Sequence, residues 1–243
     1  MIYRIADLNV EMEAGGRTAH QAESYLWASE APIDLTVRCD PASYQRKNPH
    51  LSLDDCEYLT GGTSFYRQLT GFGGMMLHAS AIEVDGLAYL FCGTSGVGKS
   101  THTELWRSLY GADRVRIIND DKPALRLVED VWYAYGTPWS GRDDRQRNVR
   151  VPLAGICFLE QGPINEICPL EGAEAVHRVL NHTVRPSEAH LMLCLLESVD
   201  RLLGRIPLWS LTCTPTEAAA ELAYRTMTLR GTEEARPAGK GHT

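Results

Sequence analysis

Residues 93–100 read G-T-S-G-V-G-K-S, a pattern whose residue types and spacing can hold a phosphate group. Its glycines permit backbone angles that other residues avoid, so successive N–H groups can turn toward one anion. Lys99 can reach the outer phosphates of a nucleotide, and the hydroxyl of Ser100 can bind Mg²⁺. The residues predicted to hold the phosphates are Gly93, Thr94, Ser95, Gly96, Val97, Gly98, Lys99, Ser100 and Thr101.

The segments on either side of this loop fit a strand before it and a helix after it. Residues 87–92 are a short apolar run that is typical of a buried strand. In residues 99–110, Leu105 and Leu109 lie four positions apart on one face of a helix, which Gly111 can end. Such a helix points its positive end at a bound phosphate. This context favours a phosphate loop over the alternative of an ordinary glycine turn.

Two adjacent carboxylates, Asp120 and Asp121, follow the apolar run that begins at Val115. Phosphoryl transfer to a hydroxyl needs an acid near Mg²⁺ and a positioned acceptor for the hydroxyl proton. The alternative is a surface turn, where aspartates are common. Because the pair follows the helix of the phosphate loop, we interpret it as part of the same site.

A basic loop comes next, and it contains Arg142, Arg145, Arg147 and Arg150. Arginine suits the charge that spreads over the oxygens of a phosphoryl group during transfer. Either one of these arginines reaches the site, with Arg142 favoured because it lies closest to residues 136–141, or the loop is only a solvated surface. In the first case the loop would favour acidic residues beside an acceptor hydroxyl.

The composition limits the classes of function. The chain has 243 residues, of which 44% are hydrophobic, and a formal net charge of −7, which predicts a packed domain with a small appendage. It has no long basic run, no apolar run that could span a membrane and no secretory signal core, so we expect a cytoplasmic protein with no nucleic-acid or membrane partner. The seven cysteines are scattered, with no C-x-x-C pair, and are expected to be free thiols.

The order of likely elements predicts three parts. Residues 1–70 are expected to form a small α/β appendage, residues 71–230 the phosphate-loop core, and residues 231–243 a disordered tail. The glycine-rich residues 61–76 are expected to be a flexible connection into the core.

Turn residues predict hairpins within the core. Asp85 and Gly86 are a strong hairpin signal between two apolar runs. Several hairpins around a phosphate loop indicate a mixed sheet instead of a doubly wound parallel one. Further turns are expected near residues 129–130 and 162–163, and helices over residues 174–184, over residues 187–206 with Ser187 as the cap, and from residue 215 onward.

The run from His78 through the phosphate loop to Trp106, followed by R-I-I-N-D-D-K at residues 116–122, resembles the HPr kinase/phosphorylase family. Within that family it looks most like the short HPr-kinase-like proteins of peptide-modifying pathways, including lasso-peptide kinases, which carry a stretch comparable to G-T-P-W-S-G at residues 136–141. The phosphate loop and aspartate pair are also similar to those of PEP carboxykinase. The resemblance implies an α/β fold with a mixed β-sheet P-loop kinase core of HPr kinase/PEP carboxykinase type.

The resemblance also implies roles for single residues. Lys99 and Ser100 would bind the phosphates and Mg²⁺, and one aspartate would be the base while the other supports the metal. We expect Asp120 to be the base, His78 to tune it, and Asp121 to join Ser100 at the metal. The expected catalytic residues are therefore Asp120, His78, Lys99 and Arg142.

By this resemblance the chain would be an ATP- and Mg²⁺-dependent serine kinase. It would transfer the γ-phosphoryl group to a Ser or Thr hydroxyl of a peptide or small protein, and self-association into a homo-oligomer is a further expectation. Two alternatives stay open. One is a small-molecule hydroxyl kinase on the same fold, and the other is a nucleotide-binding regulatory module that transfers nothing.

Overall fold

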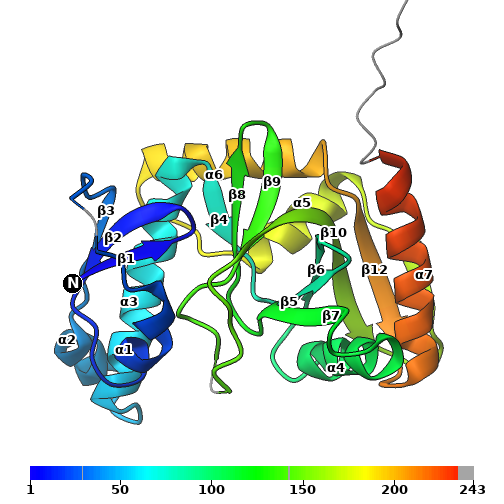
Figure 1. Cartoon of the computed structure of the whole chain (residues 1–243), viewed down its shortest axis with the longest axis horizontal. Coiled ribbons are helices and arrows are strands. Elements are labelled where there is room, and N and C mark those ends of the chain that lie inside the picture. The colour runs from blue at the N-terminus through cyan, green and yellow to red at the C-terminus, as the bar shows by residue number, and fades with distance from the viewer. Residues whose placement is uncertain (29, 142, 235–243) are drawn as a thin grey trace, which may run out of the picture.

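The computed structural model describes residues 1–28, 30–141 and 143–234. Within these residues the chain forms a sheet of three strands and a sheet of nine strands, with helices packed around them (Figure 1). The larger sheet contains both parallel and antiparallel pairs. The chain is therefore a mixed α/β protein with a mixed sheet.

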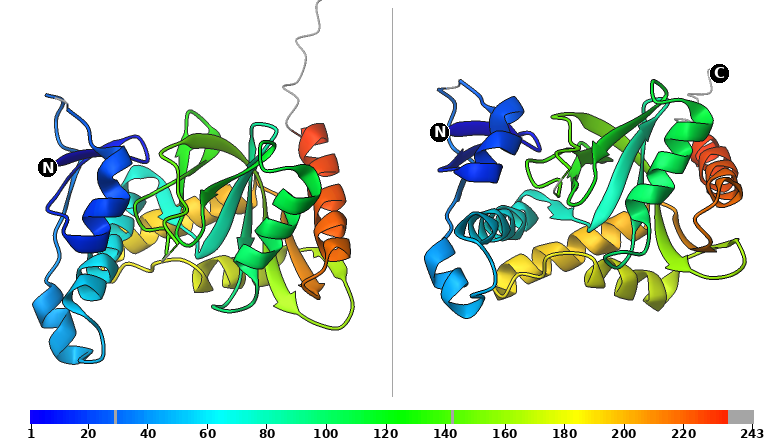
Figure 2. Two further views of the ribbon diagram at one scale, coloured as in Figure 1. Left: turned by 60° about the horizontal axis from the view of Figure 1, so that its bottom comes forward. Right: turned by 90° about the horizontal axis from the view of Figure 1, so that it is seen from below.

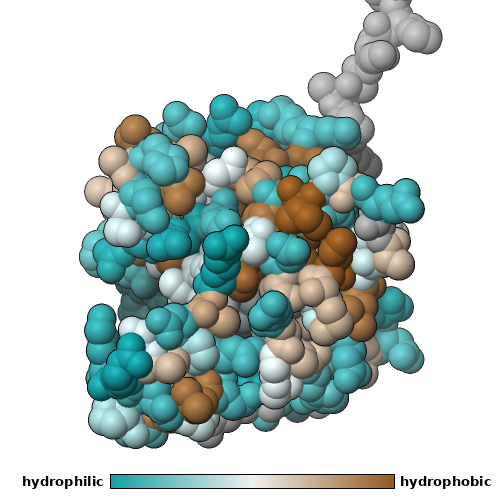
Figure 3. All heavy atoms as spheres, turned by 90° about the vertical axis from the view of Figure 1, so that its left-hand side faces the viewer, coloured by the Kyte–Doolittle hydropathy of each residue, from teal (hydrophilic) through white to brown (hydrophobic). Residues whose placement is uncertain are grey.

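The first part of the chain builds the small sheet and the helices beside it, at the left of Figure 1. Strand β1 (Ile2–Ile5) pairs antiparallel with β2 (Leu8–Met12), and β3 (Leu35–Val37) joins β2 in parallel. The helical segments here are α1 (Gly16–Ala22), a 3₁₀ turn at Glu23–Tyr25, α2 (Pro41–Lys47) and α3 (Leu53–Leu69). Seen from this end, the surface is mostly hydrophilic with separate apolar patches (Figure 3).

The glycine-rich residues 61–76 do not form a flexible connection, so that expectation is wrong. Helix α3 continues through Gly61 and Gly62, and a 3₁₀ turn at Thr70–Phe72 then leads into β4 (Gly74–Met76). The glycines are tolerated in the helix because an aromatic ring packs against them. A Cβ atom on Gly62 would lie only 3.0 Å from Cδ1 of the buried Trp139.

The large sheet is curled because its longest strand, β10 (Arg150–Gln161), pairs with different partners along its length. The first residues of β10 pair antiparallel with β9, and its later residues pair in parallel with β6 and β12. The strands run in the order β4-β8-β9-β10-β6-β5-β7, with β12 also on β10 and β11 on β12. Their bounds are β5 (Ala79–Val84), β6 (Leu87–Cys92), β7 (Val115–Asn119), β8 (Ala124–Val128), β9 (Val131–Tyr135), β11 (Glu166–Pro169) and β12 (Leu208–Cys213).

Two of the three predicted hairpins are confirmed. Asp85 and Gly86 join β5 to β6, and Glu129 and Asp130 join β8 to β9, with positive φ angles at all four residues. The third hairpin is wrong, because β12 lies between β10 and β11 and pairs with both. The local turn signal at residues 162–163 could not reveal a strand that arrives from much later in the chain.

Two pairs of helices cover the two faces of the sheet (Figure 2). Helices α4 (Lys99–Tyr110) and α7 (Glu217–Glu234) contact each other and pack on one face. Helices α5 (Gly172–Asn181) and α6 (Ala189–Leu203) pack on the other. The residue before α6 is Glu188, and no side chain caps that helix, so the expected cap at Ser187 is wrong. Helix α7 runs four residues into the tail expected from residue 231, and residues 235–243 lie outside the described part.

The strand directions bring distant segments to one edge of the large sheet. Strand β5 is antiparallel to both β6 and β7, and β10 is parallel to β6. The ends of β6, β7 and β10 therefore meet the start of β5 at the same edge. This edge carries the phosphate loop, the aspartate pair and His78, which come from separate stretches of sequence.

Candidate functional site

The predicted phosphate loop connects β6 to α4, in the strand-loop-helix order that the sequence predicts. Gly93, Gly96 and Gly98 all have positive φ angles, which glycine adopts without strain. The side chain of Lys99 is largely buried, and its Nζ donates to the carbonyl oxygens of Gly93 at 3.1 Å and Thr94 at 3.3 Å. Burial lowers the pKa of Lys99 while the nearby carboxylates oppose that shift. The ammonium group is therefore held next to the first two residues of the loop.

A buried polar network fixes the turn that carries the two aspartates. The side chain of Asn119 accepts the backbone N–H groups of Asp121 at 3.0 Å and Lys122 at 2.7 Å, and it donates to the carbonyl of Thr137 at 3.0 Å. The hydroxyl of Tyr66 donates to the carbonyl of Lys122 and bonds with the Thr137 hydroxyl. Asn119 and Thr137 are fully buried, so this turn has little freedom to move.

Asp120 points into the protein beside the phosphate loop. Its side chain is only 5% exposed, it accepts a hydrogen bond from the hydroxyl of Ser80, and the hydroxyl of Ser100 lies near enough to act on its pKa. Burial raises the pKa of Asp120, although these hydroxyls and Arg145 pull in the opposite direction. Asp120 is thus the aspartate that contacts the hydroxyl predicted to bind Mg²⁺.

Asp121 lies nearer to solvent and is paired with two basic groups. Its carboxylate is 20% exposed, lies 3.2 Å from Nε2 of His78 and also pairs with Lys122. Burial favours the neutral acid, but the hydrogen bond from His78 and the charge of Lys122 outweigh it, so the pKa of Asp121 is lowered. His78 therefore contacts Asp121 and not Asp120, the partner that we expected from the sequence.

One arginine of the basic loop reaches the aspartates. The guanidinium of Arg145 lies 3.5 Å from Asp120 and also pairs with Glu104 on α4. Arg147 instead pairs with Glu83, and Arg150 pairs with Asp7. Arg142, which the sequence favoured, lies outside the described residues.

The stretch at residues 136–141 forms the wall between the site and the N-terminal part. Trp139 is fully buried, and its ring stacks on Phe65 with 5.1 Å between ring centroids. Gly136 has no room for a side chain, because a Cβ atom there would collide with the carbonyl oxygen of Arg147. Gly141 donates its N–H to the hydroxyl of Tyr58 at 2.9 Å. Trp139 therefore contributes to the packing of the hydrophobic core.

These elements enclose a common hollow of about 410 Å³. His78, the later residues of the predicted phosphate loop and both aspartates line it together, although they come from three separate segments of the chain. Its lining residues are His78, Ser95, Gly96, Gly98, Lys99, Ser100, Thr101, Asp120, Asp121, Ser140, Gly141 and Asp143.

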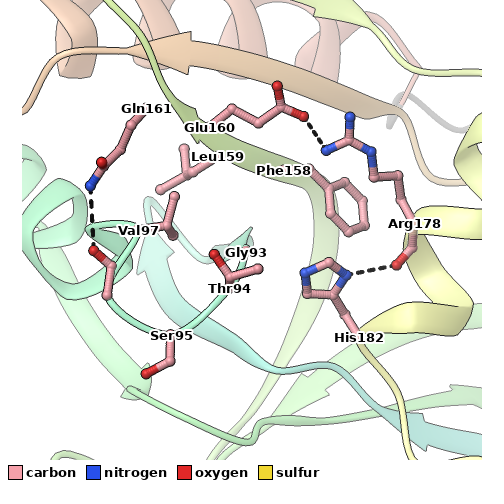
Figure 4. Close-up of a pocket in the computed structure, with 11 residues that line it drawn as sticks. Gly93, Thr94, Ser95, Val97, Phe158, Leu159, Glu160, Gln161, Arg178 and His182 are labelled. Atoms are coloured by element: carbon pink, nitrogen blue, oxygen red, sulfur yellow. Dashed lines mark hydrogen bonds and ion pairs between the residues drawn. The ribbon is translucent and has the colours of Figure 1, made fainter.

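A second hollow, of about 390 Å³, opens on the other side of the phosphate loop (Figure 4). Residues 93–97 form one wall, and the end of β10 and helix α5 form the other. Arg178 lies in it between Glu160 and the ring of His182. No short motif marks Glu160, Arg178 or His182 in the sequence, so sequence reasoning missed all three.

The donor set near the loop suits a hard cation. Within the described residues, no group of three or more His, Cys, Asp or Glu side chains could hold a metal ion by itself. Ser100 and Asp120, however, supply adjacent oxygen atoms, and Mg²⁺ commonly takes one or two protein ligands with the rest from phosphates and water. The residues present therefore fit Mg²⁺ in company with a nucleotide.

All seven cysteines are free in the structure, as predicted. Among the described helices, none is both long enough and apolar enough to cross a membrane.

Comparisons with known proteins give one clear relationship. No curated protein matches the chain. Among solved structures, it has a weak likeness to the Hpr(Ser) kinase/phosphatase from Coxiella burnetii, with 13% identity and a TM-score of 0.35 over 64% of this chain and 97% of that chain. A family model described as SynChlorMet cassette protein ScmC matches residues 59–214, which is more than half of the chain. The chain belongs to this ScmC family.

Proposed function

We propose that the protein is an ATP- and Mg²⁺-dependent kinase that transfers the γ-phosphoryl group to a Ser or Thr hydroxyl of a peptide or small protein. The observation that carries this proposal is the shared hollow lined by Lys99, Ser100 and the two aspartates. A protein that only binds a nucleotide needs no carboxylate free to accept a proton beside the phosphates.

The phosphate loop would hold the donor. Its N–H groups and the start of α4 would face the phosphates, and Lys99 would turn from the carbonyls of Gly93 and Thr94 to the outer phosphate oxygens. Mg²⁺, held by Ser100 and Asp120, would neutralise charge on the phosphate oxygens when it is bound.

The contacts favour Asp121 as the proton acceptor. A base must be ionised and reachable, and Asp121 has a lowered pKa and a carboxylate that is partly exposed in the hollow. Asp120 has a raised pKa, is almost inaccessible and already accepts a hydrogen bond from Ser80. Our proposal therefore exchanges the two roles that we expected from the sequence.

The reaction then needs only positioning and one proton transfer. The acceptor hydroxyl oxygen attacks the γ-phosphorus, and the bond from that phosphorus to the bridging oxygen of ADP breaks as the new bond forms. ADP keeps the electron pair of the broken bond, and Asp121 takes the hydroxyl proton. His78 would hold the Asp121 carboxylate toward the acceptor.

The test is to incubate the protein with Mg-ATP and a pool of Ser- and Thr-containing peptides, followed by mass measurement. We expect a gain of one phosphate on a hydroxyl, which Lys99→Ala should abolish without changing thermal unfolding. Wild-type turnover by Lys99→Ala would refute the phosphate-loop role. Efficient phosphorylation of a free metabolite, with every peptide unmodified, would refute the proposed acceptor class.

Paired aspartate variants test the division of roles. Asp121→Asn should bind ATP but lose transfer, because an amide cannot accept the hydroxyl proton. Asp120→Asn should instead need more Mg²⁺ to reach its maximal rate. Loss of the chemical step in Asp120→Asn alone, at an unchanged Mg²⁺ requirement, would show that our original assignment was the right one.

A further inference from the structure

The hollow on the far side of the phosphate loop is built from side chains that the proposed transfer step does not use. Val97, Phe158 and Leu159 give it an apolar wall, and Glu160, Gln161 and Arg178 give it polar groups. Figure 4 shows these side chains facing a common space beside residues 93–97. The hollow touches the same Ser95 and Gly96 that line the proposed active site.

The position of Lys99 indicates which end of the donor this hollow adjoins. The ammonium lies at the carbonyls of Gly93 and Thr94, and a phosphate-loop lysine contacts the β- and γ-phosphates. Gly93 and Thr94 also line the hollow. The hollow is therefore next to the phosphate that is transferred, where a segment of the acceptor would lie, and not at the nucleoside end.

Two carboxylates share the single guanidinium of Arg178, which leaves one of them in excess. Arg178 is held by Glu174, with 2.7 Å between Nε and Oε1, and it also pairs with Glu160. His182 adds no positive charge near neutral pH, because burial lowers its pKa while Nδ1 donates to the carbonyl of Arg178 at 2.8 Å. The side chain of Glu160 remains 43% exposed, so it can still meet a ligand.

The shape of the hollow suits a long side chain with a charged end. The ring of Phe158 is fixed edge-on against His182, with 5.3 Å between ring centroids, and forms the apolar wall with Val97 and Leu159. Lysine and arginine bury an aliphatic stem along such a wall while the charged end stays near a carboxylate.

We infer that this hollow is a subsite for the acceptor, which takes a lysine or arginine side chain close to the hydroxyl that is phosphorylated. This inference rests on the proposed kinase function and adds the residue class that flanks the acceptor. It differs from the expectation of acidic flanks, and among the described arginines of the basic loop, Arg145, Arg147 and Arg150 have carboxylate partners within the protein.

The experiment compares Ser peptides that differ at one flanking position, which carries lysine, norleucine or glutamate in turn. For the wild type, kcat/KM should be higher with lysine than with norleucine at one position, by roughly threefold for a partly exposed ion pair. Glu160→Gln should bring this ratio to one or below. Arg178→Gln should raise it, because two carboxylates then lack their cation. Glu197→Gln removes an equal charge from an exposed site on α6 and should leave the ratio unchanged.

Each other outcome has a clear meaning. No preference for lysine, or a preference that survives Glu160→Gln, would overturn the inference. A change in the KM for ATP with no change in peptide selection would assign the hollow to the nucleoside and also overturn it.

A failure of the proposed function is a separate result. If the wild type phosphorylates no peptide, binding of the lysine and norleucine peptides in the presence of ADP still tests the hollow by calorimetry. Tighter binding of the lysine peptide to the wild type than to Glu160→Gln would support the inference without the kinase function. Equal binding would overturn the acceptor subsite as well as the kinase function.

Discussion

The guanidinium of Arg145 lies 3.5 Å from the carboxylate of Asp120, and the backbone carbonyl of the same arginine accepts the N–H of Asp120 at 3.1 Å. Arg145 also pairs with Glu104, which lies on the helix that follows the phosphate loop. A single residue of the basic loop therefore connects that helix to the turn that carries the aspartates.

This contact predicts that Arg145→Gln lowers the rate of transfer. The variant would lose a cation beside the phosphates and a restraint on Asp120, and such losses cost on the order of 100-fold in kcat. Arg150→Gln is the matched control, because Arg150 pairs with Asp7 and packs over the ring of Tyr133. Steady-state kinetics on the same peptide would check both variants. Equal rates for the two variants would argue against a role for Arg145.

The two aspartates should have opposite effects on stability. The raised pKa of Asp120 means that its ionisation weakens the fold as the pH rises from 3.8, the ordinary value, through its folded-state pKa. Asp120→Asn should therefore unfold at no lower temperature than the wild type at pH 7, despite its higher Mg²⁺ requirement. The lowered pKa of Asp121 contributes stability above pH 3.8 that is lost as the pH falls through its folded value.

Asp121→Asn should consequently lower the unfolding temperature at pH 7, and its difference from the wild type should shrink in acid. Thermal unfolding of both variants from pH 3 to pH 7 checks the two signs. Destabilisation by Asp120→Asn at pH 7, of the size seen for Asp121→Asn, would contradict this description of the pair.

His102 should make the fold sensitive to mild acid. Burial lowers the pKa of His102 to about 4, and its neutral Nε2 accepts the indole N–H of Trp106 at 3.2 Å. The unfolded chain binds a proton near pH 6.5 and the folded protein only near pH 4, so stability is present above pH 6.5 and lost as the pH falls toward 4. The loss would reach about 3 kcal/mol.

The check is denaturant unfolding of the wild type and His102→Gln at several pH values. Glutamine can still accept a hydrogen bond from Trp106 but does not titrate, so the variant should lose less stability between pH 6.5 and pH 4. A parallel loss in both proteins would show that other groups cause the acid sensitivity.

The parts of the site that sequence reasoning found are those that short segments encode. The strand-loop-helix setting of residues 93–100, the turn of Asp120 and Asp121 and the hairpin at Asp85 each depend on neighbouring residue types, and all three are present. His78 was also found, but its partner was not, because the choice between two adjacent aspartates depends on which way each side chain points.

The parts that sequence reasoning missed depend on contacts between distant segments. Strand β12 (Leu208–Cys213) enters between β10 and β11, although it follows β11 (Glu166–Pro169) only after two helices, α5 and α6. Arg178 and His182 join the phosphate loop only because α5 packs on the sheet. The glycine pair in α3 was interpreted as the start of a flexible connection, since nothing local shows that Trp139 lies against it.

That glycine pair gives the last prediction, in which two neighbouring substitutions have different effects. Alanine is better than glycine inside a helix by about 1 kcal/mol. At Gly61 the nearest atoms to an added Cβ lie at 3.8 Å, which is ordinary contact, so Gly61→Ala should raise the free energy of unfolding by up to that amount. At Gly62 the Cβ would lie 3.0 Å from Cδ1 and 3.2 Å from Cγ of Trp139.

Trp139 cannot move aside easily, because it is fully buried and in contact with the rings of Phe65 and Tyr66. Overpacking of this kind costs about 1–3 kcal/mol, so Gly62→Ala should be less stable than Gly61→Ala and no more stable than the wild type. Urea unfolding of the three proteins should show shifted midpoints with unchanged m-values. Equal stabilisation by both alanines would mean that Trp139 does not hold its place against α3. It would also remove the physical reason for glycine at that position of the helix.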